Sequence, residues 1–405
     1  MLFRSHQICD GLCYGLAKNI ANTLFKHENI GSKIIFCGGV AANASVRHHL
    51  EALTGYEFVI DEHANFYGAV GAALCHFEAL RNQVPSKAPK PLEHLDGLFV
   101  ASQNQTVLSY PELTLKYSAY PDFNCFSSYM FESVEADIYQ DPFRISPKAA
   151  YLGMDVGSTS TKSILIDETG QPIAGFYTKT ASQPVRAVQQ ILKAYDHFFT
   201  KYSLAITIKG CGTTGSGRRI SGKILGADIE PDEITAHATA ASNLNQNVDT
   251  IIEIGGQDAK FTLLKNGIVT ASTMNSVCAA GTGSFIEEQA LKLECPLSEY
   301  SSRTEGVRSP VASDRCTVFM ERDINYYLAQ GYKKNEILAS VLHSVRDNYL
   351  TKVANIAQIG ECILFQGATA KNKALVAAFE QKLNKPIHVS KYCHLTGALG
   401  VALLV

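Results

Sequence analysis

The 405-residue chain contains no run of lysine or arginine, and its formal net charge is -2. Both features argue against nucleic acid or an anionic membrane as its main partner, because such binding needs concentrated positive charge. No apolar run reaches the roughly 20 residues of a membrane-spanning helix, and the first residues do not resemble a signal peptide. We therefore expect a cytoplasmic protein.

The eleven cysteines form no close-spaced framework, which excludes a CxxC zinc ribbon. In a chain of this length, scattered cysteines favour reduced thiols, a few of which are available to bind metal. The hydrophobic content of 46% and charged content of 18% are typical of a globular protein. Its length allows roughly two or three domains.

A β-branched strand is expected at Thr250 to Ile254, running into the tight turn Gly255-Gly256-Gln257-Asp258. Glycines in such a turn let backbone N–H groups approach a phosphate. Strands at 259–264 and near 267–273 follow. An ordinary hairpin turn is the alternative interpretation.

The same arrangement appears about a hundred residues earlier, where an apolar strand from Tyr151 ends on Asp155 and meets the turn Gly157-Ser158-Thr159. That turn offers N–H and hydroxyl donors to an anion, and Asp155 would hold a hydrated Mg²⁺. Two such hairpins predict a nucleotide in a cleft between two duplicated lobes. A third loop, at 365–372, also joins a strand to a helix and could pack on the nucleoside. None of the three is a Walker loop or a GxGxxG fingerprint.

Cys278 stands in a small-residue loop that opens a helix at about Ser284. A helix N-terminus stabilises a thiolate, which suits a metal ligand. A buried free thiol is the alternative.

The chain contains an internal repeat. Residues 34–43 and 363–372 share five identities in ten at an offset of 329 residues, and the same offset pairs Gly68 with Gly397 and Gly71 with Gly400. We expect 1–80 to be the C-terminal part of a domain whose complete copy occupies 151–405, with helices at 1–25 and 67–80 and a strand at 33–37. The first copy lacks both phosphate hairpins, so it cannot bind ATP alone, and it is either part of a truncated product or a docking surface.

Residues 81–150 are expected to be a linker and an irregular region, with prolines at 85, 89 and 91. Cys125 in this region is interpreted as structural.

Six motifs carry a resemblance to the BadF/BadG/BcrA/BcrD ATPase family, and within it to activators of (R)-2-hydroxyacyl-CoA dehydratases. They are, in order, GMDVGSTSTK, GCGTTGSGR, IEIGGQDAK, NSVCAAGTG, RCTVFMERD and FQGATAKN. The resemblance covers 151–405, and 1–80 resembles the tail of a second such domain, as in fused two-domain activators. It implies an α/β fold of the actin, sugar kinase and heat-shock chaperone type, with duplicated βββαβα lobes around a nucleotide cleft.

The resemblance also implies ATP or ADP with Mg²⁺ in the cleft, and one [4Fe-4S] cluster bridging a homodimer. Its cluster ligands fall on Cys278 and Cys316; two thiolates per chain then require two chains for four ligands. A helix at about 318–329 would begin just after Cys316. The other nine cysteines are interpreted as small buried hydrophobes.

The nucleotide positions of the family fall on residues of the three loops. Catalytic roles are expected for Asp155, Gln257 and Asp258, and nucleotide contacts for Gly157, Ser158, Thr159, Lys162, Gly255, Gly256, Gly367, Ala368 and Asn372. Ala368 replaces a more usual glycine, which is tolerable only if its φ is negative. Residues 212–217 are either a phosphate-side loop or a helix lead-in.

The implied activity is ATP-coupled transfer of a low-potential electron, received from ferredoxin or flavodoxin, to a 2-hydroxyacyl-CoA dehydratase or a related CoA-ester enzyme in an anaerobic host. ATP would change the angle between the lobes and so the exposure and potential of the cluster. Three alternatives remain open: a benzoyl-CoA-reductase type of subunit, a small-molecule kinase of the same superfamily, and a truncated non-catalytic partner module.

Overall fold

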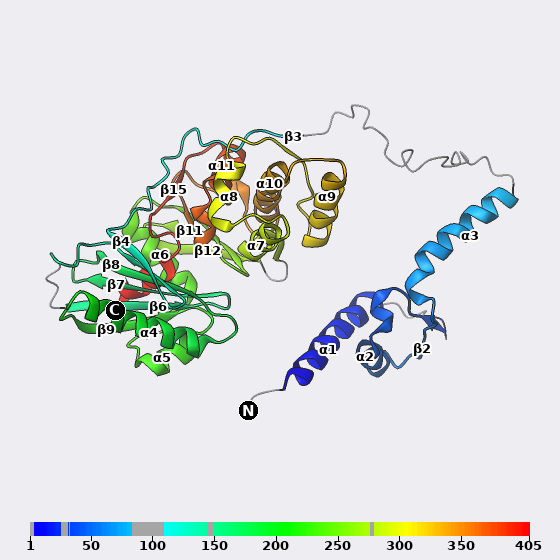
Figure 1. Ribbon diagram of the computed structural model, residues 1–405, viewed down its shortest axis with the longest axis horizontal. Coiled ribbons are helices and arrows are strands. Elements are labelled where there is room, and N and C mark those ends of the chain that lie inside the picture. The colour runs from blue at the N-terminus through cyan, green and yellow to red at the C-terminus, as the bar shows by residue number, and fades with distance from the viewer. Residues whose placement is uncertain (1–3, 26–30, 32, 83–108, 145–148, 276–278) are drawn as a thin grey trace. The chain divides into compact units, whose positions relative to one another are not determined.

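The computed structural model describes residues 4–25, 31, 33–82, 109–144, 149–275 and 279–405. The chain divides into two compact units, Met1–Ala101 and Ser102–Val405, called unit 1 and unit 2 below (Figure 1). Among the helices of these described ranges, none combines the length and apolar character that a membrane crossing requires.

Unit 1 is a small α/β unit. Its elements are α1 (Ser5–Leu24), β1 (Ile34–Ile35), the 3-10 turn η1 (Gly39–Ala42), α2 (Ala44–Thr54), β2 (Phe58–Val59), η2 (Ala64–Phe66) and α3 (Tyr67–Arg81). Its core contains Ala17, Val46, Leu50 and Phe58. The predicted helices at 1–25 and 67–80 are confirmed, and the predicted strand at 33–37 is present but shorter.

The elements of unit 1 repeat those at the end of unit 2 at the same offset of 329 residues. Parallel strands β1 and β2 pair Ile34 with Phe58, and β14 and β15 pair Ile363 with Ile387. The turn after the first strand also has the same backbone, with φ 90° and ψ 171° at Gly38 and φ 96° and ψ 162° at Gly367. Because L side chains rarely adopt such φ values, glycine is needed at both positions.

Unit 2 begins with a lobe built on a six-stranded sheet in the order β4-β5-β8-β7-β6-β9. We call it lobe I. Its strands are β4 (Ser127–Phe131), β5 (Val134–Ile138), β6 (Ala149–Val156), β7 (Ser160–Asp167), β8 (Pro172–Lys179) and β9 (Thr207–Thr214), and its helices are α4 (Pro184–Lys201), α5 (Arg218–Leu225) and α6 (Glu233–Leu244). Strands β6, β7 and β8 form an antiparallel meander, and β9 adds in parallel to β6 after the crossover through α4. Helix α4 buries one apolar stripe, including Val188, Ile191 and Phe198, on this sheet.

Lobe II repeats this plan with the sheet order β12-β11-β10-β14-β15. Its strands are β10 (Thr250–Ile254), β11 (Ala259–Lys265), β12 (Ile268–Met274), β14 (Ile363–Gln366) and β15 (Ile387–Val389), and its helices are α7 (Gly283–Lys292), α8 (Leu297–Thr304), α9 (Thr317–Ala329), α10 (Lys334–Lys352) and α11 (Lys373–Leu383). Short turns η4 (Ala279–Gly281), η5 (Ile356–Gln358) and η6 (Ala368–Lys371) complete it. Both lobes therefore share three antiparallel strands followed by parallel strands reached through helices, as expected of the actin-like fold.

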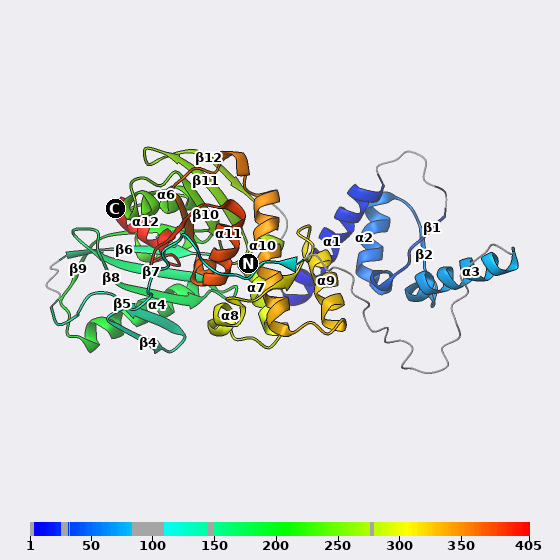
Figure 2. The same ribbon diagram turned by 90° about the horizontal axis from the view of Figure 1, so that it is seen from above.

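The last helix, α12 (Thr396–Leu404), returns from lobe II to lobe I. It lies with β6, β7, β9 and α6 of lobe I, where the red end of the chain meets green elements in Figures 1 and 2. Small residues allow this packing: a Cβ on Gly400 would lie 1.7 Å from the carbonyl oxygen of Ala236, and one on Gly153 would lie 1.9 Å from that of Ala398. The chain end thus ties the two lobes together.

The described part of the expected linker and irregular region, residues 109–144, is built into unit 2. Strand β3 (Ser109–Tyr110) pairs with β13 (Ser309–Pro310) of lobe II, and hairpin β4–β5 extends the lobe I sheet along β8. Leu113 is fully buried in the core of lobe II. Backbone N–H groups of residues 116–118 all donate to the buried carboxylate of Glu380. The weak periodicity of this segment arises because it is a strap held by both lobes and not a layer of its own.

Candidate active site

Two phosphate-type turns, one from each lobe, face each other in unit 2. Each is closed by the same bond: the N–H of Gly157 donates to the carbonyl of Ser160 at 3.0 Å, and that of Gly255 to the carbonyl of Asp258 at 2.9 Å. The two turns also lie close to each other: a Cβ added to Gly256 would lie only 2.6 Å from Oγ1 of Thr159. The duplication inferred from the sequence therefore produces a paired geometry.

A polar cavity of about 120 Å³ lies between the turns, and we call it the phosphate compartment. It brings together most residues predicted for the site, namely Asp155, Gly157, Ser158, Thr159, Lys162, Gly255, Gly256, Gln257, Asp258, Gly367 and Ala368. Asn372, the remaining predicted nucleotide contact, lines the neighbouring cavity. The sequence motifs thus predicted a set of residues that the fold assembles in one place.

Asp155 ends strand β6 at the mouth of this compartment, and it is 8% exposed. Its Oδ2 atom lies 3.3 Å from Nζ of Lys162, which is opposite on β7. Burial lowers the pKa of Lys162, but Asp155 together with Tyr177 and Glu253 more than offsets this, so the net shift is upward. The pair places a fixed cation beside a carboxylate that can hold a hydrated Mg²⁺.

A second charged cluster surrounds Lys260 and contains residues of both lobes. Nζ of Lys260 lies 2.7 Å from Glu233, 3.0 Å from Glu253 and 3.0 Å from Asp258. Burial lowers the pKa of Lys260, but Glu253 and the other two carboxylates raise it well above its usual range. Nε2 of His237 lies 3.5 Å from Glu253, and Nδ1 of His237 lies 2.8 Å from the side-chain oxygen of Gln366. These charges can polarise water and stabilise a phosphate chain together with its metal.

Three residues of this cluster, Glu233, His237 and Lys260, were not predicted as site residues. Glu233 and His237 are four residues apart on α6, so they share one helix face, and that spacing was the available signal. Lys260 and Glu253 belong to the IEIGGQDAK motif, but neither was predicted to have a role in the site. Their function as charge partners appears only when β10 and β11 pair.

A larger cavity of about 460 Å³ adjoins the phosphate compartment, and we call it the nucleoside compartment. Ile286, Leu297 and Tyr300 give it apolar walls, and Ser301 and Asn372 add polar groups. A mostly apolar cavity with a few polar groups suits a nucleobase and its sugar.

Residues of the third loop line both compartments. Thr369 donates from Oγ1 to the carbonyl of Ile254 at 2.8 Å, which fixes the loop to the end of β10. Gly367 has φ 96°, whereas Ala368 is outside the residues with positive φ. The alanine at the position of a family glycine is therefore tolerated without backbone strain.

Of residues 212–217, the first three end β9 and 215–217 form the turn that leads into α5. Ser216 lines the phosphate compartment, and Gly217 donates its N–H to the carbonyl of Val156 at 2.8 Å just before α5 begins. A Cβ on Gly217 would lie 2.6 Å from Cγ1 of Val156, so glycine permits this close approach.

Cys316 is half-buried at the N-cap of α9, and its thiol forms no disulfide. The predicted helix after it is confirmed. The backbone before it is fixed by Asn348 of α10, whose amide donates to the carbonyls of Asp314 at 2.6 Å and Arg315 at 2.8 Å. A thiol at a helix N-terminus, on an anchored backbone, fits one ligand of a metal cluster. Cys278 lies outside the described residues.

The other cysteines are only partly as predicted. Cys295 and Cys393 are buried, but Cys9, Cys37 and Cys75 of unit 1 are exposed, so the interpretation of all nine as buried hydrophobes is wrong. Cys125 is half-buried, with its Sγ 3.8 Å from Asp137. Within the residues that the structure describes, no group of three or more His, Cys, Asp or Glu side chains could hold a metal ion.

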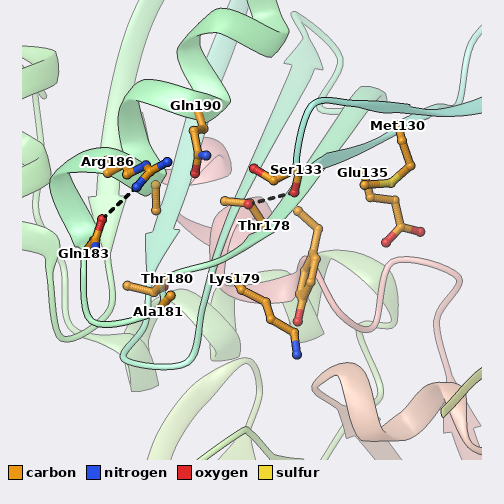
Figure 3. Close-up of a pocket in the computed structure, with 12 residues that line it drawn as sticks. Met130, Ser133, Glu135, Thr178, Lys179, Thr180, Ala181, Gln183, Arg186 and Gln190 are labelled. Atoms are coloured by element: carbon orange, nitrogen blue, oxygen red, sulfur yellow. Dashed lines mark hydrogen bonds between the residues drawn. The ribbon is translucent and has the colours of Figure 1, made fainter. Parts of the chain in front are cut away.

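A further, open cavity of about 500 Å³ shares Glu135 and Tyr177 with the lining of the nucleoside compartment. Figure 3 shows Gln183 and Arg186 at the start of α4 on one side, and Met130 and Glu135 of the β4–β5 hairpin on the other. Nη1 of Arg186 donates to the side chain of Gln183 at 3.3 Å. Its lining contains none of the residues predicted from the motifs.

The paired turns, the charged phosphate compartment and the adjoining apolar cavity define a two-lobed nucleotide-binding ATPase. The model of the BadF/BadG/BcrA/BcrD ATPase family matches residues 152–405, and the chain belongs to this family.

The chain is similar to curated proteins and to solved structures of this family. It is 33% identical over 256 residues, 62% of this chain and 95% of the relative, to the (R)-2-hydroxyglutaryl-CoA dehydratase activating ATPase of Acidaminococcus fermentans. The crystal structure named as component A of that dehydratase system superposes with a TM-score of 0.56 at 32% identity, covering 64% of this chain and 97% of the other. The activator of 2-hydroxyisocaproyl-CoA dehydratase from Clostridium difficile, solved with bound ADPNP, gives a TM-score of 0.56 at 31% identity, covering 63% and 93%.

Proposed function

We propose that this protein is an ATP-dependent activator of a 2-hydroxyacyl-CoA dehydratase or a related CoA-ester enzyme. In this proposal ATP with Mg²⁺ binds in the two compartments of unit 2, and ATP hydrolysis is coupled to delivery of one low-potential electron. The dehydratase activators among the relatives support the partner, and the family supports the ATPase activity.

One structural observation carries the proposal: the phosphate turn of lobe II is bonded directly to the start of α7. The N–H groups of Gly283 and Ser284 donate to the carbonyls of Gly255 and Gly256, each at 2.8 Å. Helix α7 follows the loop that contains Cys278 in the sequence. A nucleotide that shifts this turn would therefore also shift the helix that follows that cysteine in the sequence.

Cys316 is the second cysteine of the proposed cluster site. It lies at the N-terminus of α9, and α10 holds the backbone on its N-terminal side through Asn348. In the proposal, Cys278 and Cys316 of two copies of the chain hold a shared [4Fe-4S] cluster, because four thiolates are needed and each chain contributes two. Bound there, the cluster would supply one-electron chemistry at low potential, with ferredoxin or flavodoxin as the donor.

The chain's own residues have defined tasks in this proposal. Asp155 holds hydrated Mg²⁺ and pairs with Lys162, the glycine turns orient the phosphate chain, and Gln257 with Asp258 positions the attacking water. The turn Gly367 to Asn372 contacts the nucleoside. Positioning and fixed charge account for most of the catalysis of phosphoryl transfer, so such a site needs no covalent step on the protein.

The proposal is tested by iron and acid-labile sulfide content with electron paramagnetic resonance on protein purified anaerobically. One four-iron cluster per dimer is expected in the wild type, and its loss in Cys278→Ala and in Cys316→Ala. Cys362→Ala is a matched control, since Cys362 is also a half-buried free thiol in lobe II. A wild type without a cluster after reconstitution would remove the electron-transfer role and leave an ATPase of other function.

A further inference from the structure

Asn348 of α10 contacts two segments of lobe II that are far apart in the sequence. Its Nδ2 atom donates to the carbonyls of Asp314 at 2.6 Å and Arg315 at 2.8 Å, directly before Cys316. Its Oδ1 atom lies against Gly281 of η4, where an added Cβ would be only 2.8 Å from that oxygen. Because 3% of Asn348 is exposed, its side chain is enclosed where these two segments meet α10.

The segment with Gly281 leads directly to the phosphate turn of lobe II. Two residues after Gly281, α7 begins with Gly283 and Ser284, whose N–H groups donate to the carbonyls of Gly255 and Gly256. The contact is tight, since a Cβ on Gly283 would lie 2.9 Å from the carbonyl oxygen of Gly255. A displacement of the turn therefore reaches Gly281 through two hydrogen bonds and a short stretch of backbone.

The bonds of Asn348 are the closest hold of α10 on the segment before Cys316. Thr351, one turn further along α10, also donates to Asp314, but its Oγ1 lies 3.3 Å from the carboxylate and its side chain is exposed. A surface contact of that kind is readily replaced by water. An enclosed amide that loses its partners has no water to replace them, so it favours the arrangement in which both segments move together.

We infer that Asn348 is a positioning residue that transmits movement of the phosphate turn to the backbone before Cys316. Bound nucleotide fixes the turn, the turn fixes the start of α7, and Gly281 fixes the amide that holds the carbonyls of Asp314 and Arg315. Among the described residues, those that line the two compartments do not include Asn348, so its removal leaves the nucleotide contacts in place. The inference rests on the proposed nucleotide site and adds the residue through which that site acts on Cys316.

The test is hydrogen–deuterium exchange, measured by mass spectrometry on the full chain purified anaerobically, with and without ADPNP and Mg²⁺. Two segments are followed: 283–286 at the start of α7, and 314–319 around Cys316. In the wild type, ADPNP is expected to slow exchange in both segments, by about threefold at 314–319. Asn348→Ala removes the amide, and Asn348→Asp keeps its shape but not its donor. In both variants 283–286 should still respond to ADPNP, whereas 314–319 should not.

Asn335→Ala is the matched control, because Asn335 is an exposed residue of the same helix. Both segments should keep their wild-type response in this variant. An amide with only a structural role would give faster exchange at 314–319 in the Asn348 variants but leave the ratio with and without ADPNP unchanged.

That unchanged ratio in either Asn348 variant would overturn the inference. A wild type in which ADPNP slows exchange at 283–286 but not at 314–319 would also overturn it. Loss of the response at 283–286 in both variants would contradict it too, since Asn348 would then act on the nucleotide site itself. Absence of ADPNP binding by the wild type would instead refute the proposed nucleotide site.

Discussion

Glu253 and Lys260 are direct cross-strand partners on β10 and β11, and Oε1 of the glutamate lies 3.0 Å from Nζ of the lysine. Both side chains are nearly enclosed, at 9% and 5% exposure. Two further carboxylates, of Glu233 and Asp258, contact the same Nζ atom. One buried cation therefore holds three elements of the site together: strand β10, helix α6 and the phosphate turn.

Lys260→Met is expected to destabilise unit 2 strongly. It keeps the length of the side chain but leaves three carboxylates without their cation, and breaking a buried pair in this way costs about 3–5 kcal/mol. Urea denaturation measures the free energy of unfolding, and the ATPase rate of each variant is measured separately. Lys265→Met, on the exposed end of the same strand, should change both by little. Equal stability of the two variants would show that Lys260 has no structural role as a counter-ion.

Asp155→Asn is expected to weaken the dependence of the ATPase on Mg²⁺. The amide keeps the shape of the side chain but loses the charge that would orient the waters of a hydrated metal. A loss of this kind typically costs about 10- to 100-fold in metal affinity or activity. A Mg²⁺ titration of the ATPase rate measures it, with Asp196→Asn on the exposed face of α4 as control. An unchanged titration curve would remove Asp155 from the metal site.

Gly256→Ala is expected to separate the two phosphate turns. The added Cβ would lie 2.6 Å from Oγ1 and 2.7 Å from Cβ of Thr159, so one turn must move. Displaced phosphate contacts should reduce ATP affinity on the order of 10-fold. The control Gly71→Ala adds its Cβ where no atom lies within 4 Å. Nucleotide affinity equal to the wild type in Gly256→Ala would mean that the turns tolerate a wider spacing.

Acidification is expected to destabilise unit 2 through His343. This side chain is fully buried on α10, stacked on Tyr110 at 4.2 Å, and its Nδ1 lies 2.7 Å from Nη1 of Arg346. Burial and then the Arg346 guanidinium lower its pKa to about 3, although the nearby Asp347 acts in the opposite direction. The folded state thus disfavours the imidazolium form.

The direction in which stability changes with pH follows from the number of protons that the folded and unfolded chains bind. Because the folded pKa of His343 lies below the usual 6.5, its contribution is complete above that pH and is lost as the pH falls towards about 3. Between these values the unfolded chain binds one more proton, so the slope is about 1.4 kcal/mol per pH unit. Urea unfolding between pH 7 and 5 should show a shallower slope for His343→Gln than for wild type. The exposed control His388→Gln should keep the wild-type slope, and a wild-type slope in His343→Gln would contradict the assignment.

Local sequence was sufficient to predict the strands and turns that line the phosphate compartment. Thr250 to Ile254 reads as a strand because β-branched residues favour a buried extended backbone, and Gly255-Gly256 must end it; the structure has β10 with these bounds. The helix that begins after Cys316 was likewise predicted from the sequence. Motif order then indicated the family, and the family indicated the fold.

The segment 109–144 shows what local sequence patterns do not predict. Its strands are short, only β5 alternates buried apolar with polar residues, and the segment packs on two different lobes in succession. Its burial depends on partners such as Glu380, more than 200 residues away in sequence. Local composition contains no information about such contacts, so the sequence predicts only an irregular region here.

The sequence by itself determined the two glycine turns, the helix after Cys316 and the repeat at an offset of 329 residues, because each depends on neighbouring residues or on self-similarity. Tertiary structure alone decided that Lys260 meets Glu233 and that Asn348 contacts the segments before Cys316 and before α7. Those positions depend on how α6 and α10 pack in unit 2, and packing joins residues that no local pattern connects.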